Sequence, residues 1–146
     1  MNAHWGIAVA AIFTWLGMVL AISFLEAPLK FRAPGITIPL GLGIGRLVFR
    51  ALNTSEAVLG SVAAIALFGH VPPVAAVAAF SCAVLVLAVQ VLGVRPALTR
   101  RSDEVLSAAG AGEVPAERSS AHVVYVGLEV VKVVSLLVAG ILLLTG

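Results

Sequence analysis

The sequence predicts an all-α membrane protein: an antiparallel four-helix transmembrane bundle with an interfacial segment between the first and second helices. Hydrophobic residues make up 61% of the chain and charged residues 11%, whereas about a quarter of a soluble domain is charged. Apolar stretches of about 20 residues, the length that crosses a bilayer, recur along the chain. The 146 residues therefore leave room for a single transmembrane domain, residues 1–146, and for no separate soluble domain.

The four spans are expected at about residues 5–25, 53–69, 73–94 and 120–144. The first lacks a basic stretch before it and a small-residue cleavage pattern after it, which favours a span over a signal peptide. The paired Pro72 and Pro73 suit a tight turn that starts the third span. Residues 95–120 have mixed charge, so we expect a surface loop with one short helix after Ser102.

The start of the second span has two interpretations. Prolines before Leu40 argue against helix there. Asn53 and Glu56 have the spacing of a helix N-cap and its third-position acid, which favours a short interfacial helix that bends into a span at Asn53. The alternative is one tilted helix over about 40–69, with Arg46, Arg50 and Asn53 sharing a face.

The positions of the basic residues predict the orientation, because cytoplasmic loops retain Lys and Arg. Eight of the nine basic residues fall in the segments between spans one and two and between spans three and four: Lys30, Arg32, Arg46, Arg50, Arg95, Arg100, Arg101 and Arg118. Both termini are therefore expected outside a bacterial plasma membrane. The ninth, Lys132, is predicted to lie within the membrane.

The first basic segment also carries aromatic residues, a mixture typical of chain lying among anionic lipid headgroups. Lys30, Arg32, Arg46 and Arg50 are the candidate contacts for such headgroups or for an anionic substrate. We expect the lipid bilayer as a partner, together with a second copy of the chain or another membrane subunit, and no nucleic acid. Small residues four apart, such as Gly17 and Ala21 or Gly60 and Ala64, indicate close helix packing.

The sequence gives only weak signals for nucleotide binding, metal binding or a disulfide. The run GLGIGR at 41–46 follows no strand, so it does not indicate a nucleotide-binding loop. His4 and His70 are expected at the same membrane face, but nothing in the sequence joins them as a metal ligand set. Cys82 is the single cysteine and forms no intrachain disulfide. We therefore expect no metal or cofactor.

The fourth span carries the strongest signal, a polar stripe of His122, Tyr125, Glu129 and Lys132. Their spacing keeps them within about 80° of arc on one helix face. An unpaired charge at mid-membrane costs about 2.5 to 3.5 kcal/mol. Glu129 and Lys132 should consequently face the bundle and form a buried ion pair.

Two roles remain open for this stripe. One is a relay for protons or substrate that runs from His122 through Tyr125 to Glu129. The other is a structural clamp in which the ion pair fixes the helix register. No second acid within the membrane is evident from the spacing of the remaining residues, which favours the clamp slightly.

The layout resembles that of small bacterial four-helix membrane proteins of unknown function related to transmembrane protein 205. The runs SFLEAPLKF, GIGRLVFRALNTSEA and AHVVYVGLEVVKVVSLLVAGILLL carry the resemblance. The matching positions are Ala27, Pro28, Phe31, Gly45, Arg46, Phe49 and His122. The resemblance implies a plasma-membrane bundle without a settled activity, and it does not extend to Glu129 and Lys132.

The run FRALNTSE is similar to a signature of the membrane-associated glutathione-transferase and eicosanoid family. In that family an Arg, an Asn and a Glu help to bind glutathione, which would make Arg50, Asn53 and Glu56 a second site. The family has three residues between the Arg and the Asn, whereas this chain has two. The offset rotates the arginine by about 100° on a helix.

These observations favour a small transport or permeation protein that uses the stripe on the fourth span. A non-catalytic accessory or scaffold subunit of a larger membrane complex is the first alternative, and a glutathione-dependent membrane transferase is the second. The sequence favours a non-enzymatic role, with no catalytic residues assigned.

Overall fold

The computed structural model describes residues 3–68, 71–112 and 120–146, and the side chains of 120–122 lie outside the described part. The described residues form helices and turns and contain no strand. Three helices are long and apolar enough to cross a membrane, within Ala3–Arg32, Val74–Gly110 and Val123–Thr145. Large apolar side chains lie exposed along these helices, as expected for a surface that faces lipid.

The first long helical rod begins with α1 (Ala3–Val19) and continues through a π-helical segment, η1 (Leu20–Glu26). It ends in the short α2 (Ala27–Leu29) and a 3₁₀ turn, η2 (Lys30–Arg32). The helix thus passes Pro28, which lies directly after the π-helical segment η1; local π-helical adjustments of this kind accommodate the missing backbone donor of a proline. It extends beyond the predicted end of the first span at residue 25.

A single continuous helix, α3 (Ile38–Leu67), follows the turn at 33–37. The Thr37 hydroxyl caps its start by accepting a hydrogen bond of 3.3 Å from the Leu40 amide, and Pro39 lies in its first turn. The favoured prediction, a bend with a new helix beginning at Asn53, is therefore wrong. Of the two interpretations, the structure has the continuous helix, and Asn53 and Glu56 lie in its middle.

The second half of the chain starts with α4 (Val74–Val89), which passes through a π-helical segment, η3 (Gln90–Val94), into α5 (Arg95–Gly110). The last helix is α6 (Ser120–Thr145). The prediction of a surface loop from residue 95 is wrong over its first part. Pro96 follows the π-helical segment η3, which accommodates its missing backbone donor, and the Ala, Leu, Arg and Glu residues after it favour helix.

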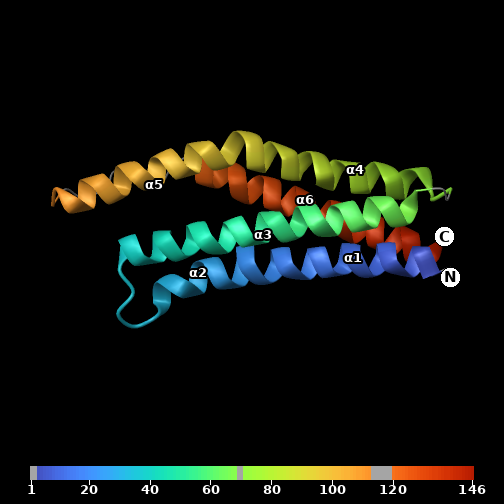
Figure 1. Ribbon diagram of the computed structural model, residues 1–146, viewed down its shortest axis with the longest axis horizontal. Helices are drawn as coiled ribbons and strands as arrows, with labels where there is room; N and C mark the ends of the chain where they lie inside the picture. Colours follow the sequence, from blue (N-terminus) through green and yellow to red (C-terminus); the bar gives the residue numbers. More distant parts are fainter. Residues whose placement is uncertain (1–2, 69–70, 113–119) are drawn as a thin grey trace.

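Helix α1 packs along α3 and also against α6, and α6 packs along α4. Helices α3 and α4 contact each other only sparsely. The two termini lie at one end of the molecule, and the turn between α2 and α3 lies at the opposite end, toward which α5 projects (Figure 1). We refer to these as the terminal end and the α5 end.

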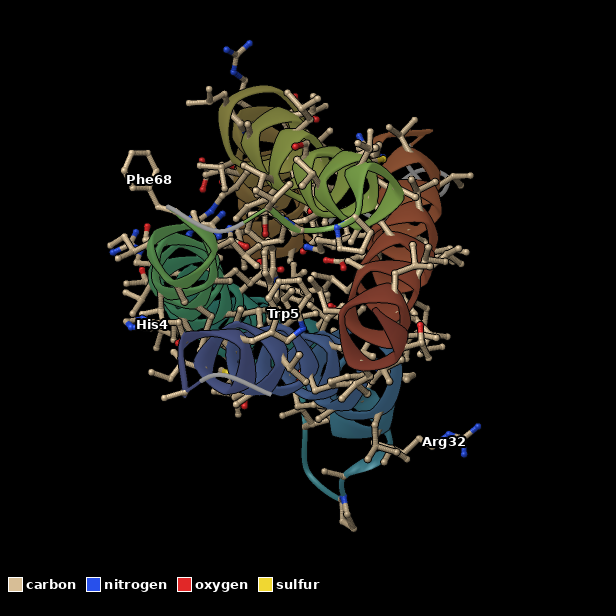
Figure 2. The ribbon with its side chains drawn as sticks, turned by 90° about the vertical axis from the view of Figure 1, so that its right-hand side faces the viewer. His4, Trp5, Arg32 and Phe68 are labelled. Carbon is tan, nitrogen blue, oxygen red and sulfur yellow. The ribbon has the colours of Figure 1, made fainter. Side chains whose placement is uncertain are left out.

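The interior toward the terminal end is apolar. Trp15 is fully buried and meets Phe80 edge to face, with ring centroids 6.4 Å apart. Further buried side chains in this apolar core include Ile12, Ala63, Ala76, Leu136, Ala139 and Leu143. The Trp5 indole donates a hydrogen bond to the Leu143 carbonyl, and Figure 2 shows Trp5 directed between the helices, whereas Phe68 and Arg32 point outward.

Gly60 allows α1 and α3 to approach closely. A Cβ atom at this position would lie 3.3 Å from Cζ3 of Trp15, whereas a Cβ at Gly17 would meet nothing within 4 Å. Gly60→Val is therefore expected to displace the Trp15 ring and to lower the free energy of unfolding by about 1 to 3 kcal/mol. Chemical unfolding in detergent micelles, followed by tryptophan fluorescence, measures the change.

Gly17→Val is the matched control, because it makes the same substitution on an exposed helix face. Equal losses of stability in the two variants would contradict the close approach of α3 to Trp15.

Candidate functional site

The Lys132 side chain of α6 is fully buried between the helices and has three acceptors around its ammonium group. Its Nζ lies 2.5 Å from Oε1 of Glu56 on α3 and 3.2 Å from Oε2 of Glu129 on α6. It also donates a hydrogen bond of 2.7 Å to Oε1 of Gln90. The buried cation therefore has as many acceptors nearby as it has protons to donate.

Glu56 is the best-coordinated acid of the cluster. It is 0% exposed, and its Oε1 receives the Lys132 ammonium and a hydrogen bond of 2.8 Å from the Trp15 indole. With the Asn53 amide oriented as its neighbours require, Asn53 donates to Oε2 of Glu56 at 3.1 Å. Both oxygens of Glu56 thus have donors, which is what a buried carboxylate needs.

The cluster continues toward the α5 end through Asn53. In the same orientation, the Asn53 side-chain oxygen accepts a hydrogen bond of 3.2 Å from Nη1 of Arg95. Arg95 is half-buried at the start of α5. A line of polar contacts therefore runs from Arg95 at the edge of the protein through Asn53 to Glu56 and Lys132.

Gln90 lies at the start of the π-helical segment η3 and continues the buried face of α4, on which Ala76, Phe80, Ala83 and Leu87 recur at helical spacing. It is the first residue of that segment and is 1% exposed. A π-turn inserts one extra residue into a helix and so changes which side chains face inward after it; such turns are frequent at functional sites. The buried face of α4 is apolar, and Gln90 adds a polar contact to it where this helix passes into η3.

Three buried polar groups in and beside the cluster have no hydrogen-bond partner among the described residues. These are both carboxyl oxygens of Glu129, the amide nitrogen Nε2 of Gln90 and the hydroxyl of Tyr125. Glu129 is 1% exposed and Tyr125 8% exposed. The 3.2 Å contact of Glu129 with Lys132 is thus an ion pair without an aligned hydrogen bond. Buried polar groups normally have hydrogen-bond partners, so this set indicates a site that binds a further group.

The residues of the predicted stripe are placed as follows. Tyr125, Glu129 and Lys132 lie on the buried face of α6, and the side chain of His122 lies outside the described residues. Glu129 and Lys132 form the expected ion pair. However, the carboxylate nearest to Lys132 belongs to Glu56 of α3, a second buried acid that the spacing of the residues did not reveal.

Glu56 was not predicted to be a buried acid, because its spacing from Asn53 matches that of a helix N-cap and its third-position acid. The signal that could have revealed it is the buried face of α3, where Leu52, Glu56, Gly60 and Ala63 recur at helical spacing. Arg50, by contrast, is exposed. The three residues compared with the transferase signature therefore do not face one common space.

The four basic residues of the predicted headgroup contact do not form one cluster. Lys30 lies 3.5 Å from Glu26 and close to the rings of Phe31 and Phe49. The Arg46 guanidinium contacts Asp103 of α5 at 2.5 Å. Arg32 and Arg50 are exposed, so these two remain the better candidates for contact with anionic headgroups.

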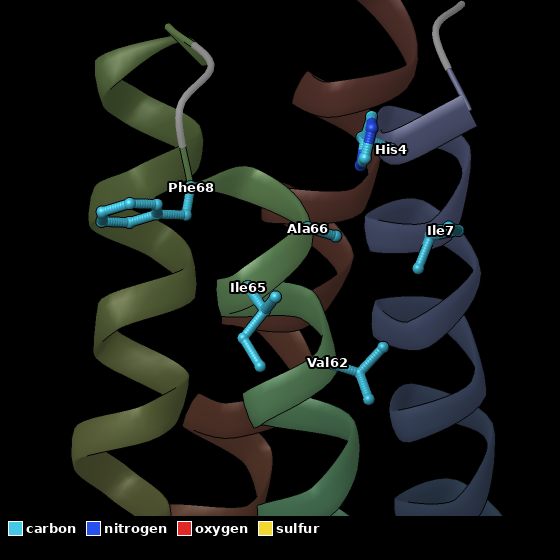
Figure 3. Close-up of a pocket in the computed structure, with 6 residues that line it drawn as sticks. All are labelled: His4, Ile7, Val62, Ile65, Ala66 and Phe68. Atoms are coloured by element: carbon cyan, nitrogen blue, oxygen red, sulfur yellow. The ribbon is translucent and has the colours of Figure 1, made fainter.

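The surface also has shallow grooves between α1 and α3. The larger, of about 430 Å³, lies near the terminal end and is lined by His4, Ile7, Val62, Ile65, Ala66 and Phe68 (Figure 3). Its lining is apolar apart from His4, and it lies away from the buried cluster. His70 falls outside the described residues, and the described residues contain no group of three His, Cys, Asp or Glu side chains able to hold a metal ion.

Comparison with protein-family models, with curated proteins and with solved structures found no match for this chain. The arrangement of its own residues therefore carries the functional argument.

Proposed function

We propose that the chain is a small transport or permeation protein of the bacterial plasma membrane, built as an antiparallel four-helix transmembrane bundle with both termini outside. The three apolar helices support the membrane assignment. Helix α3 would be the fourth span, since the apolar α1 flanks it and its buried face supplies Glu56 to the cluster. The cytoplasmic side would be the α5 end, where most of the described basic residues lie.

The observation that carries this function is the composition of the buried cluster. Glu56 and Lys132 alone would make a complete ion pair, because both have their donors or acceptors close by. Glu129 adds a second buried carboxyl beside the same ammonium, with no hydrogen-bond donor among the described residues. A charged group within the membrane is costly and typically marks an ion or proton pathway. Glu129 is therefore the residue that we expect to line the pathway of small ions through the protein.

The test uses the purified protein in sealed lipid vesicles, with separate gradients of H⁺, Na⁺, K⁺ and Cl⁻ and a trapped fluorescent indicator for each. We expect the protein to raise the flux of at least one of these ions above that of protein-free vesicles. Glu129→Gln should return the flux to the protein-free level, because it removes the ionisable group and preserves the shape. Glu104→Gln is the matched control on the exposed α5 and should keep the wild-type flux.

The absence of flux for all four ions with correctly folded protein would contradict transport. It would favour the second candidate, a non-catalytic scaffold subunit of a membrane complex. One observation supports that candidate: Trp15 of α1, Glu56 of α3, Gln90 of η3 and Lys132 of α6 join all four long helical segments through one set of contacts. Co-purification of a stoichiometric partner in mild detergent would then be expected.

A further inference from the structure

Glu56, Glu129 and Lys132 cannot all be ionised without leaving one negative charge in excess. The three side chains are at most 1% exposed, and they share one ammonium group. Among the described residues, Arg95 is a further cation beside the cluster, and its Nη1 contacts the side chain of Asn53 rather than a carboxyl oxygen. An uncompensated charge in this interior costs several kcal/mol. These three side chains alone are therefore one positive charge short of neutrality, which favours the binding of one more positive charge.

The contacts identify which carboxyl receives that charge. Glu56 has three donors, from Lys132, Trp15 and Asn53, and these stabilise its ionised form. Among the described residues, Glu129 has the 3.2 Å ion pair with Lys132 and faces Tyr125, but no aligned hydrogen bond reaches its carboxyl oxygens. Neutralising Glu129 therefore removes the excess charge at the smaller cost in lost interactions.

The surrounding groups favour a proton over a metal cation. A metal ion bound to Glu129 would lie beside the Lys132 ammonium, which repels it. The other unpartnered groups are the amide N–H of Gln90, which is a donor and cannot coordinate a cation, and the Tyr125 hydroxyl. A donor and a hydroxyl suit a protonated carboxyl, or a water molecule that bridges it to them.

From this arrangement we propose that Glu129 is a proton-binding site that exchanges its proton with water at the α5 end; the proposal rests on the transport function above and names its ion. In the binding step, hydronium gives a proton to the Glu129 carboxylate, which leaves a neutral carboxyl and one water molecule. The charged or titratable described groups facing Glu129 are Lys132 and Tyr125 of α6 and Glu56 of α3, with Arg95 of α5 beyond Asn53. From α1 and from the α4–η3 side, the neutral side chains of Trp15 and Gln90 face the cluster.

The direction of exchange follows from what lies on each side of the cluster. Toward the α5 end lie Tyr125, one helical turn from Glu129, and the polar line from Asn53 to the half-buried Arg95. Toward the terminal end the interior is closed by the apolar core, including Ile12, Phe80 and Leu136. Among the described residues, polar side chains therefore continue from the cluster toward the α5 end, whereas toward the terminal end the buried Ser135 is followed by the apolar core. The proposed exchange with water accordingly takes place on the α5 side.

Infrared difference spectroscopy of the full chain in phosphatidylcholine and phosphatidylglycerol vesicles tests the site. The sequence has only seven Asp and Glu residues, so the C=O stretching band of a single protonated carboxyl can be assigned by substitution. We expect a pH-dependent band that is sensitive to exchange into D₂O. Glu129→Gln should remove it, Glu129→Asp should shift it, and the matched Glu104→Gln should leave it unchanged.

A band that survives Glu129→Gln, or no protonated carboxyl at any pH at which the protein is folded, would overturn the proposal. So would a band that disappears on addition of Na⁺ at constant pH, because a metal cation would then compete for the site. The flux and infrared measurements separate the two ideas. A Glu129 band without any flux would refute transport alone, and flux of another ion without the band would refute the proton site alone.

Discussion

Lys132→Met alone is expected to lower the free energy of unfolding by about 3 to 5 kcal/mol, because it leaves the buried Glu56 without its cation. Removing one partner of a buried pair costs more than replacing both, since the remaining charge stays desolvated. Combining Lys132→Met with Glu56→Gln should therefore recover much of the loss. Unfolding in detergent micelles, together with the folded yield after purification, measures both variants.

The matched control is Lys30→Met, the same substitution at the other lysine. Lys30 pairs with Glu26 at 3.5 Å near the α5 end, so its loss should cost about 1 kcal/mol. A stability of Lys132→Met equal to that of Lys30→Met would show that the buried pair does not hold the helices together.

The second large effect is a non-additive loss of stability when Glu56 and Glu129 are both substituted. Glu129→Gln is expected to leave stability almost unchanged, because glutamine resembles the neutral carboxyl. Glu56→Gln should cost about 1.5 to 3 kcal/mol, since hydrogen bonds to a charged group become neutral ones. The double variant leaves Lys132 with no anion at all and should lose about 3 to 5 kcal/mol, more than the two single losses together.

A double-mutant cycle in the same unfolding assay measures this coupling. If the two losses simply add, each acid acts independently of Lys132, and the shared-cation arrangement is refuted. The Glu104→Gln substitution combined with Glu56→Gln is the control for additivity, because Glu104 lies on the exposed α5.

Composition and apolar run length were sufficient to predict an all-helical membrane protein, because lipid imposes both on a spanning helix. The boundaries of α3 were harder to predict from the sequence. Arg46, Arg50, Asn53 and Glu56 lower the hydropathy of this helix, and it is not among the three that are apolar enough to span. Prolines suggested breaks, but Pro39 lies in a first turn, where proline is tolerated, and Pro28 and Pro96 each follow a π-helical segment within a continuous helix.

The site was predictable only as far as a single helix determines it. Helical periodicity placed Tyr125, Glu129 and Lys132 on one face, which the structure has buried. The partner of Lys132 depends on which helix packs opposite it, and no local pattern encodes that choice. Glu56 is such a partner, and Gln90, on the buried face of α4, is a second one.

Helix α5 differs from the other long helices in having no buried residue. Toward α3 it is held mainly by the Arg46 side chain, through Asp103 at 2.5 Å and the Thr99 carbonyl at 3.3 Å. Local opening costs least where few apolar contacts are broken. We therefore expect α5 to act in folding as a separate unit of lower stability, which opens at less cost than the apolar core. Because Arg95 begins this unit, each such opening would free the Arg95 side chain from Asn53 and bring bulk water one step closer to Glu56.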